Sequence, residues 1–259
     1  MAKTILVTGA TDGIGLLTAQ KLAADGHEVL VHGRSAEKLA RAAELLGGHA
    51  KTYQADLSKM GDVTALAEEI KSDHDRLDVL INNAGILKSP VVETEAGRDI
   101  RFDVNTIAPY ILTRALLPIM PSGARVVNLS SAAQARVDLD ALQSFRDMGD
   151  MEAYAQSKLA ITIWSAELAK QERDKIIVAV NPGSLLASKM VKEGFGVAGS
   201  DLNIGADILL RAALSPEFEG KSGAYFDNDS GSFAAPHAAA KDPGQIQGVM
   251  SVLAQLTGR

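Results

Sequence analysis

The stretch K-T-I-L-V-T-G-A-T-D-G-I-G, from Lys3 to Gly15, most constrains what this chain can fold into. Its first half, Lys3 to Thr8, is rich in β-branched and aliphatic residues and too short for a helix, which favours a buried parallel strand. Three glycines then stand where the absence of a Cβ allows a tight turn and close approach of the backbone to a phosphate. A helix from Ile14 to about Ala24 would point its unpaired N–H groups and positive dipole end at this turn. The stretch therefore predicts an anion site.

Neighbouring sequence favours a dinucleotide over other phosphate ligands, although a glycine-rich turn by itself ends many strands. A second strand, Glu28 to His32, arrives after one helix and completes the βαβ unit that a dinucleotide site requires. A P-loop would need Lys-Ser or Lys-Thr directly after the glycines, and neither is present. The only G-K-S, Gly220 to Ser222, lacks the leading glycine and is expected in a loop.

Composition excludes several classes of function. The 259 residues, 46% of them hydrophobic, suit one large α/β domain. A formal net charge of −6 without a basic run argues against nucleic acid or an anionic membrane as a partner. Cysteine is absent and the five histidines show no metal-ligand spacing, so no metal site is expected. With no leader pattern before Lys3 and no apolar run of membrane-spanning length, we expect a cytoplasmic protein.

The junction after the second strand indicates which dinucleotide is bound. NAD sites tend to place an acid there to hold the ribose 2′-hydroxyl, whereas an arginine accommodates the 2′-phosphate of NADP. This chain has Gly33 and Arg34, followed by Ser35 as the expected cap of a helix from Ala36 to Leu46. Although an arginine before a helix is often only a solvated charge, its distance from the glycines favours NADP(H) over NAD(H).

Strands and helices continue to alternate, which predicts a parallel, doubly wound α/β sheet, a single Rossmann-type domain over residues 1–259. About seven strands are expected in the order 3-2-1-4-5-6-7, with helices on both faces and a ligand crevice at the carboxyl ends of the strands. The later strands are predicted at Ala50–Gln54, Leu77–Ile81, Arg125–Leu129, Ile176–Val180 and Ala224–Phe226. The later helices are predicted at Met60–Lys71, Asp99–Leu116, Ala153–Gln171, Asn203–Leu214 and Gln245–Leu256, with Ser230–Ala240 as loop.

Polar residues at these strand ends are candidates for the crevice. Asp56 either meets the adenine or caps the next helix. The amides of Asn82-Asn83-Ala84-Gly85 either brace the backbone or touch the cofactor. Asn105 lies among apolar neighbours in a predicted helix, so it must be either a structural clamp or a holder of ordered water. Pro109 is expected to kink that helix.

Tyr154 and Lys158 are a candidate pair for proton exchange. They are four residues apart on a predicted helix, so their side chains share one face. A free tyrosine has a pKa near 10, and an adjacent ammonium is expected to lower it toward the range useful for proton exchange at neutral pH. Ser131, which follows the fifth strand, offers a hydroxyl for the substrate oxygen.

Taken together, Thr8 to Gly15, Asn82 to Gly85, Asn105, Ser131 and the Tyr154/Lys158 pair resemble the short-chain dehydrogenase/reductase superfamily over nearly the whole chain. The resemblance implies that Ser131 and Tyr154 are catalytic, that Lys158 holds the nicotinamide ribose and tunes the tyrosine, and that Asn105 maintains a water-filled proton relay. It also implies a cofactor site formed by Gly9, Thr11, Asp12, Gly13, Ile14, Gly15, Arg34, Asp56, Leu57, Asn83, Ala84, Gly85, Tyr154, Lys158, Pro182 and Gly183.

An insert at about Ala132 to Glu152 makes the chain similar to the branch that holds retinol dehydrogenases and WW-domain oxidoreductases, and also to protochlorophyllide reductases. Asn181 is a departure, because many retinol enzymes carry histidine there. A substrate loop is expected at about Ser184 to Asp201. Residues of the insert and loop form either an apolar substrate pocket or ordinary packing: Phe145, Met148, Met151, Met190 and Phe195.

The function expected from this resemblance is hydride transfer between NADP(H) and a carbonyl or secondary alcohol of a fairly apolar small molecule, with Tyr154 managing the proton. Two alternatives remain open. One is a reductase of carbon–carbon double bonds that uses the same tyrosine, and the other is a non-catalytic NADP(H) sensor. Family resemblance also implies a homodimer or homotetramer formed through the helices that carry Asn105 and Tyr154.

Overall fold

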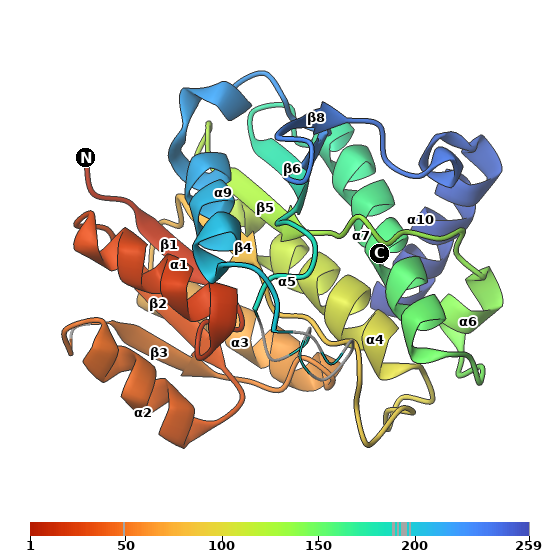
Figure 1. Ribbon diagram of the computed structural model, residues 1–259, viewed down its shortest axis with the longest axis horizontal. Helices are drawn as coiled ribbons and strands as arrows, with labels where there is room; N and C mark the ends of the chain where they lie inside the picture. The colour runs from red at the N-terminus through yellow and green to blue at the C-terminus, as the bar shows by residue number, and fades with distance from the viewer. Residues whose placement is uncertain (49, 188–189, 191, 193–195, 197, 259) are drawn as a thin grey trace.

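An eight-stranded sheet forms the centre of the computed structural model (Figure 1), which describes residues 1–259 except 49, 188–189, 191, 193–195, 197 and 259. The strand order is β3-β2-β1-β4-β5-β6-β7-β8, and all neighbours are parallel except β7 and β8. The strands are β1 (Thr4–Val7), β2 (Glu28–Gly33), β3 (Lys51–Gln54), β4 (Val79–Asn82), β5 (Arg125–Leu129), β6 (Ile176–Asn181), β7 (Tyr225–Asp227) and β8 (Ser232–Ala234).

The predicted order of the first seven strands is confirmed, but the prediction of loop over Ser230–Ala240 is wrong. This segment contains β8, which pairs with β7 in antiparallel register, and a 3₁₀ turn at Ala238–Lys241. Phe233 explains the strand, because its ring packs 5.2 Å from Phe218 and 5.0 Å from Phe226 between centroids. Burial of one aromatic residue among small polar neighbours therefore stabilises an edge strand that composition did not indicate.

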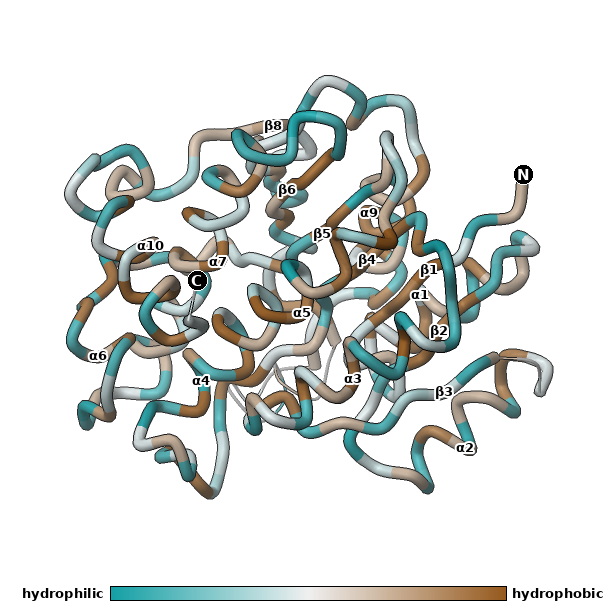
Figure 2. The backbone as a smooth tube through the Cα atoms, turned by 180° about the vertical axis from the view of Figure 1, so that it is seen from behind, coloured by the Kyte–Doolittle hydropathy of each residue, from teal (hydrophilic) through white to brown (hydrophobic). Residues whose placement is uncertain are grey.

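Helices cover both faces of the sheet because successive strand residues point to opposite sides. Ile5 and Val7 of β1 face a core shared with α1, α2 and α9, whereas Leu6 faces a second core shared with α3, α5, α7 and α10. Figure 2 shows the hydrophobic residues concentrated along the central strands. The helices are α1 (Gly13–Ala24), α2 (Ala36–Leu45), α3 (Met60–Asp73), α4 (Ile100–Phe102), α5 (Ala108–Leu116), α6 (Leu139–Gln143), α7 (Asp150–Gln171), α9 (Leu202–Leu214) and α10 (Pro243–Thr257).

The helix predicted over Asp99–Leu116 is interrupted by a π-helical segment, Asp103–Ile107, that joins α4 to α5. Pro109 lies in the first turn of α5, directly after this segment. Because proline has no N–H, it cannot donate to the carbonyl of Asn105 four residues earlier, which is consistent with an irregular turn at this point. π-Helical turns are frequent at functional sites, and this one carries Asn105.

The chain itself covers α7, the long helix that carries Tyr154. Every residue from Ala155 to Ser165 is buried, and α10 packs against both α7 and α6. At the opposite side of the molecule lie β3 and α2 (Figure 1). The homodimer or homotetramer remains a prediction. Among the described residues, no helix is both long and apolar enough to span a bilayer.

Much of the predicted substrate loop, residues 184–201, lies outside the described residues, including Phe195. Its two described ends are joined by backbone hydrogen bonds. The Ala187 N–H donates to the Ser200 carbonyl and the Ser200 N–H donates to the Leu185 carbonyl, both at 2.7 Å. Residues 185–187 therefore lie beside residue 200, just before the start of α9.

Candidate active site

The glycine turn is braced from β4. Thr8 Oγ1 accepts hydrogen bonds from the N–H groups of Asn83 (3.0 Å) and Ala84 (3.1 Å). In return, Asn83 Nδ2 donates to the carbonyls of Thr8 (2.8 Å) and Gly9 (3.2 Å). The sequence left two roles open for these amides, bracing the backbone or touching the cofactor. The observed contacts of Asn83 brace the backbone. They hold the turn between β1 and α1 at a fixed distance from the neighbouring strand.

The turn fits the phosphate-binding role expected of it. A Cβ at Gly15 would lie 2.3 Å from Asn83 Nδ2 and 2.4 Å from the Gly9 carbonyl oxygen, so only glycine allows this packing. Gly13 has φ +54°, and a Cβ there would meet nothing within 4 Å. Because Gly13 also lines the main cleft, its bare backbone is open to a ligand. Asp12 begins α1 by accepting from the Gly13 N–H at 2.8 Å.

Cationic side chains gather where the cleft passes β2 and β3. Arg34 is exposed and lines the cleft together with Lys38 and Lys59. Lys38 lies 3.6 Å from the Asp12 carboxylate. The sequence analysis did not identify Lys38, although its place in the first turn of the helix that follows Arg34 was a signal for it. The site therefore carries more positive charge than Arg34 alone supplies.

Asp56 lines the cleft but does not cap the next helix. Its carboxylate accepts from the N–H (3.0 Å) and hydroxyl (2.8 Å) of Ser58, and the cap position of α3 is Lys59, without a side-chain cap. Burial disfavours the charged form of Asp56. The Ser58 hydrogen bonds, together with the positive charges of Arg34 and Lys59, nevertheless hold its pKa below the usual range. A carboxylate is therefore available at this end of the cleft.

Tyr154 and Lys158 meet in the first half of α7. Lys158 Nζ lies 5.5 Å from the centroid of the Tyr154 ring and donates to the Leu129 carbonyl at 2.8 Å. Burial lowers the pKa of Lys158 to about 8. Burial also raises the pKa of Tyr154, and hydrogen bonding by Ser131 counters part of that rise. The predicted lowering of the tyrosine pKa is therefore wrong in direction for this structure, because desolvation of the phenolate outweighs the hydrogen bond from Ser131.

The backbone of Ser131 is held by two side chains that the sequence analysis did not identify. Its carbonyl accepts from the Tyr225 hydroxyl at 3.0 Å and from Gln134 Nε2 at 2.9 Å. Its hydroxyl oxygen accepts from the Ala133 N–H at 3.1 Å. Tyr225 belongs to β7, 94 residues further along the chain. In the sequence it is marked only by its place in the predicted strand Ala224–Phe226.

Asn105 acts as a clamp in the structure. Its side chain accepts from the Ile86 N–H at 2.8 Å and donates to the Ile86 carbonyl at 2.9 Å. It also donates to Ser157 Oγ at 3.0 Å. A Cβ placed on Gly85 would lie 3.3 Å from Asn105 Oδ1 and 3.4 Å from Lys158 Nζ, so the asparagine and the lysine meet at this glycine. The proton-relay role implied for Asn105 stays a prediction.

A cleft of about 1190 Å³ joins the glycine turn to Tyr154 and Lys158. Sites for one drug-sized ligand occupy ~300–1,000 Å³, so this cleft has room for a substrate beside a dinucleotide. Three candidates do not line it: Asn105 is buried behind Ile86, while Ser131 and Gly183 lie outside the lining. The predicted residues that do line it are Gly9, Thr11, Asp12, Gly13, Ile14, Gly15, Arg34, Asp56, Leu57, Asn83, Ala84, Gly85, Tyr154, Lys158 and Pro182.

The predicted pocket of aromatic and methionine side chains is only partly formed. Met190 lines the cleft, but Phe145, Met148 and Met151 do not. Met148 packs against the core and Met151 is 40% exposed. Ordinary packing is therefore the better description for the insert. The apolar wall of the cleft comes instead from the segment after β4, from α4 and the π-helical segment, and from α10: Ile86, Leu87, Ile100, Val104 and Leu256.

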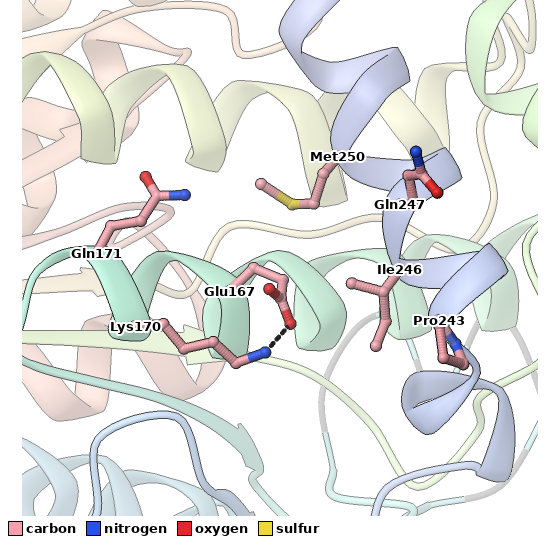
Figure 3. Close-up of a pocket in the computed structure, with 7 residues that line it drawn as sticks. All are labelled: Glu167, Lys170, Gln171, Pro243, Ile246, Gln247 and Met250. Atoms are coloured by element: carbon pink, nitrogen blue, oxygen red, sulfur yellow. Dashed lines mark hydrogen bonds and ion pairs between the residues drawn. The ribbon is translucent and has the colours of Figure 1, made fainter.

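A second pocket lies between α7 and α10 (Figure 3), lined by Glu167, Lys170, Gln171, Pro243, Ile246, Gln247 and Met250. Lys170 and Glu167 form an ion pair at 2.5 Å along its α7 side. Because Glu167 follows Tyr154 by 13 residues on one helix, the pocket is about 20 Å from the phenol along the helix axis. It therefore plays no part in the site described above. Within the described residues, no group of three or more histidine and carboxylate side chains is arranged to hold a metal.

Known proteins share both the sequence and the fold. The short chain dehydrogenase family model matches residues 3–195. Retinol dehydrogenase 13 of Homo sapiens is 32% identical over 264 residues, which cover 91% of this chain and 79% of that protein. An uncharacterized protein from Mycobacterium paratuberculosis has a crystal structure with a TM-score of 0.82 at 28% identity, covering 99% of this chain and 93% of that chain. The crystal structure of landomycin C-6 ketoreductase, which contains NADP and rabelomycin, has a TM-score of 0.70 at 30% identity, covering 88% of this chain and 95% of that chain.

These matches confirm the resemblance, including its retinol dehydrogenase branch, and the chain belongs to the short-chain dehydrogenase family.

Proposed function

We propose that this protein is an NADP(H)-dependent oxidoreductase that interconverts a carbonyl and a secondary alcohol. The observation that carries the proposal is one continuous cleft with a glycine cradle and cations at one end and Tyr154 and Lys158 at the other. Ser131 lies beside the phenol closely enough to influence its pKa. A cradle for phosphates, an acid and an amine in one cleft are what a dinucleotide-dependent carbonyl reduction requires.

NADP(H) is favoured over NAD(H) by the charges near β2. The exposed Arg34 follows β2, and Lys38 lines the cleft one helical turn later. A 2′-phosphate pairs well with such a cluster, because an arginine can bind phosphate through two parallel hydrogen bonds. The landomycin C-6 ketoreductase structure, which contains NADP, is a similar fold that supports the same choice. The 2′-hydroxyl of NAD would offer these cations no anionic partner.

The catalytic residues would act in the reduction as follows. The chemistry supplied by a bound nicotinamide is hydride transfer to the carbonyl carbon. Tyr154, kept protonated at neutral pH by its raised pKa, donates its phenolic proton to the carbonyl oxygen. Lys158, with a pKa of about 8, remains largely protonated at neutral pH and stabilises the resulting phenolate until solvent returns the proton. Family resemblance assigns the substrate oxygen to Ser131, which lies outside the cleft lining but hydrogen-bonds the phenol that faces the cleft.

An apolar substrate fits the end of the cleft near Tyr154. The residues there that do not serve the cofactor include Ile86, Leu87, Val104 and Leu256, which present hydrocarbon to the interior. Apolar walls with few polar groups are typical of sites that recognise hydrophobic small molecules. The retinol dehydrogenase relatives, named for an apolar alcohol, are in keeping with this choice. We therefore propose a substrate with substantial apolar surface next to its carbonyl.

Spectrophotometric screening tests the proposal. Wild-type protein is assayed with a panel of ketones, aldehydes and alcohols against NADPH and NADP⁺, and against the non-phosphorylated pair. Tyr154→Phe should lose about 100-fold or more in kcat, because general acid catalysis contributes ~10²–10⁴-fold, while NADPH still binds. If the kcat of Tyr154→Phe falls less than roughly tenfold, the acid is another group.

Product analysis with deuterium-labelled NADPH, together with the same screen, separates the two alternative functions. A carbon–carbon double-bond reductase would transfer a deuterium from labelled NADPH to an alkene carbon, whereas a carbonyl reductase would place it on the carbinol carbon. A sensor would bind NADPH tightly and oxidise it with no compound in the panel.

A further inference from the structure

His32 joins the two sides of the nucleotide cleft through its imidazole ring. It is 3% exposed and lies near the carboxyl end of β2, between β1 and β3 in the sheet. The Gly9 N–H donates to His32 Nδ1 at 3.2 Å, and His32 Nε2 lies 3.2 Å from the Ala55 carbonyl oxygen. One ring therefore spans from the glycine turn after β1 to the residue after β3.

The contact with Gly9 decides the protonation state of the ring. A backbone N–H can only donate, so Nδ1 must accept, and the neutral imidazole then carries its proton on Nε2. That proton points at the Ala55 carbonyl, which can only accept. A ring protonated on both nitrogens would place an N–H against the Gly9 N–H. The described contacts are thus satisfied by one tautomer of the neutral histidine.

Backbone bonds already tie the same three strand ends together. The Ala10 N–H donates to the His32 carbonyl at 3.0 Å, and the Ala55 N–H donates to the Gly33 carbonyl at 3.2 Å. The imidazole adds a second bond on each side, at the level where the strands end and the cleft begins. His32 itself lines the cleft, as do Gly9 and Ala55.

We propose that His32 is a positioning residue for the dinucleotide, holding the glycine turn and the end of β3 at the spacing that the adenosine half of the cofactor needs. The inference rests on the proposed function, since it assumes that a dinucleotide occupies this cleft. Gly9 opens the turn expected to receive the phosphates, and Ala55 precedes Asp56 and Leu57, which line the adenine end. If either imidazole bond is lost, the backbone bond alone holds the wall on that side, and the cofactor must supply more of the order on binding.

Three substitutions test the two hydrogen bonds of the His32 ring, first one at a time and then together. In His32→Asn the side-chain oxygen can take the place of Nδ1 toward Gly9 but cannot reach Ala55. In His32→Gln the side-chain nitrogen can take the place of Nε2 toward Ala55 but offers no acceptor to Gly9. His32→Ala removes both bonds. We expect the Kd for NADPH to rise roughly 3- to 10-fold for each single loss and roughly 10- to 100-fold for the alanine variant.

Titration of NADPH fluorescence on the purified full chain measures these affinities. The matched control is His74→Gln, because His74 is also a largely buried histidine. It lies 2.8 Å from the Tyr53 hydroxyl and does not line the cleft. This control should lose stability but keep the wild-type Kd. Hydrogen exchange of the ligand-free protein should also show faster exchange over residues 5–15 in His32→Gln than in His32→Asn.

Each outcome supports or overturns a defined part of the argument. A wild-type protein that binds neither NADPH nor NADH rejects the proposed function and this inference together. Wild-type binding with all three His32 variants within twofold of the wild-type Kd overturns the inference alone. An equal rise in Kd for His74→Gln also overturns it, because the effect would then reflect general destabilisation. For active protein, a raised KM for NADPH at unchanged saturated kcat supports positioning.

Discussion

Acid should destabilise this protein in a way that depends on His32. Burial, the largest influence, lowers the pKa of this histidine from 6.5 to about 4, although the Ala55 carbonyl and the Asp56 carboxylate both favour the charged ring. Between these two values the unfolded chain binds a proton that the folded chain excludes. Stability must therefore fall as the pH decreases from 6.5 toward 4, and the contribution of the neutral ring is fully present above about 6.5.

The size of the effect follows from the two pKa values. Complete titration across this interval corresponds to about 3 kcal/mol, and at about pH 5 roughly 2 kcal/mol of it has been lost. In His32→Gln the side chain does not titrate, so this variant lacks that part of the pH dependence. At about pH 7.5 wild type should be the more stable protein by roughly 1 kcal/mol, the worth of one buried hydrogen bond. That advantage should disappear or reverse at about pH 5.

Urea unfolding of both proteins at several pH values measures the difference directly. The chain has one tryptophan, Trp164, which is fully buried in α7 and so reports unfolding through its fluorescence. Carboxylates and the other histidines titrate in both proteins, so their contributions cancel in the comparison. A stability gap that stays constant to within about 0.5 kcal/mol between pH 7.5 and pH 5 would mean that His32 is not held neutral by its surroundings.

Three further predictions concern the cleft and the serine beside it. Gly15→Ala, whose Cβ would lie 2.3 Å from a neighbouring amide nitrogen, should lower the free energy of unfolding by about 1–3 kcal/mol and abolish NADPH binding. The control Gly26→Ala, at φ +83° in open space, should lower the free energy of unfolding by about 1–2 kcal/mol and leave NADPH binding unchanged. Urea unfolding and fluorescence titration test both variants. Tyr225→Phe should lower kcat several-fold in the wild-type background but not in the Ser131→Ala background, because the Tyr225 hydroxyl acts by holding Ser131. An equal loss of kcat in both backgrounds of this double-mutant cycle would contradict the prediction. Arg34→Ala should raise the Kd for NADPH by roughly 10- to 100-fold and that for NADH by less than about threefold, and a parallel loss for both cofactors would refute the 2′-phosphate assignment.

The sequence by itself determined the features that depend on local pattern. The β–α alternation predicted the order of seven strands, because buried parallel strands read as short apolar runs and helices as longer periodic ones. The glycine turn was recognisable because a tight turn and close approach exclude side chains. Tyr154 and Lys158 could be paired because four residues separate neighbours on one helical face. Each of these inferences needs only residues that are close together in the chain.

Tertiary structure decided the features that depend on which distant groups meet and how deeply they are buried. No local pattern shows that Tyr225 holds the Ser131 carbonyl across 94 residues, or that His32 joins Gly9 to Ala55. The pKa of Tyr154 is raised because burial disfavours the phenolate more than the hydrogen bond from Ser131 favours it. Residue spacing specifies neighbours along one element, whereas desolvation and long-range hydrogen bonds exist only once separate elements have packed together.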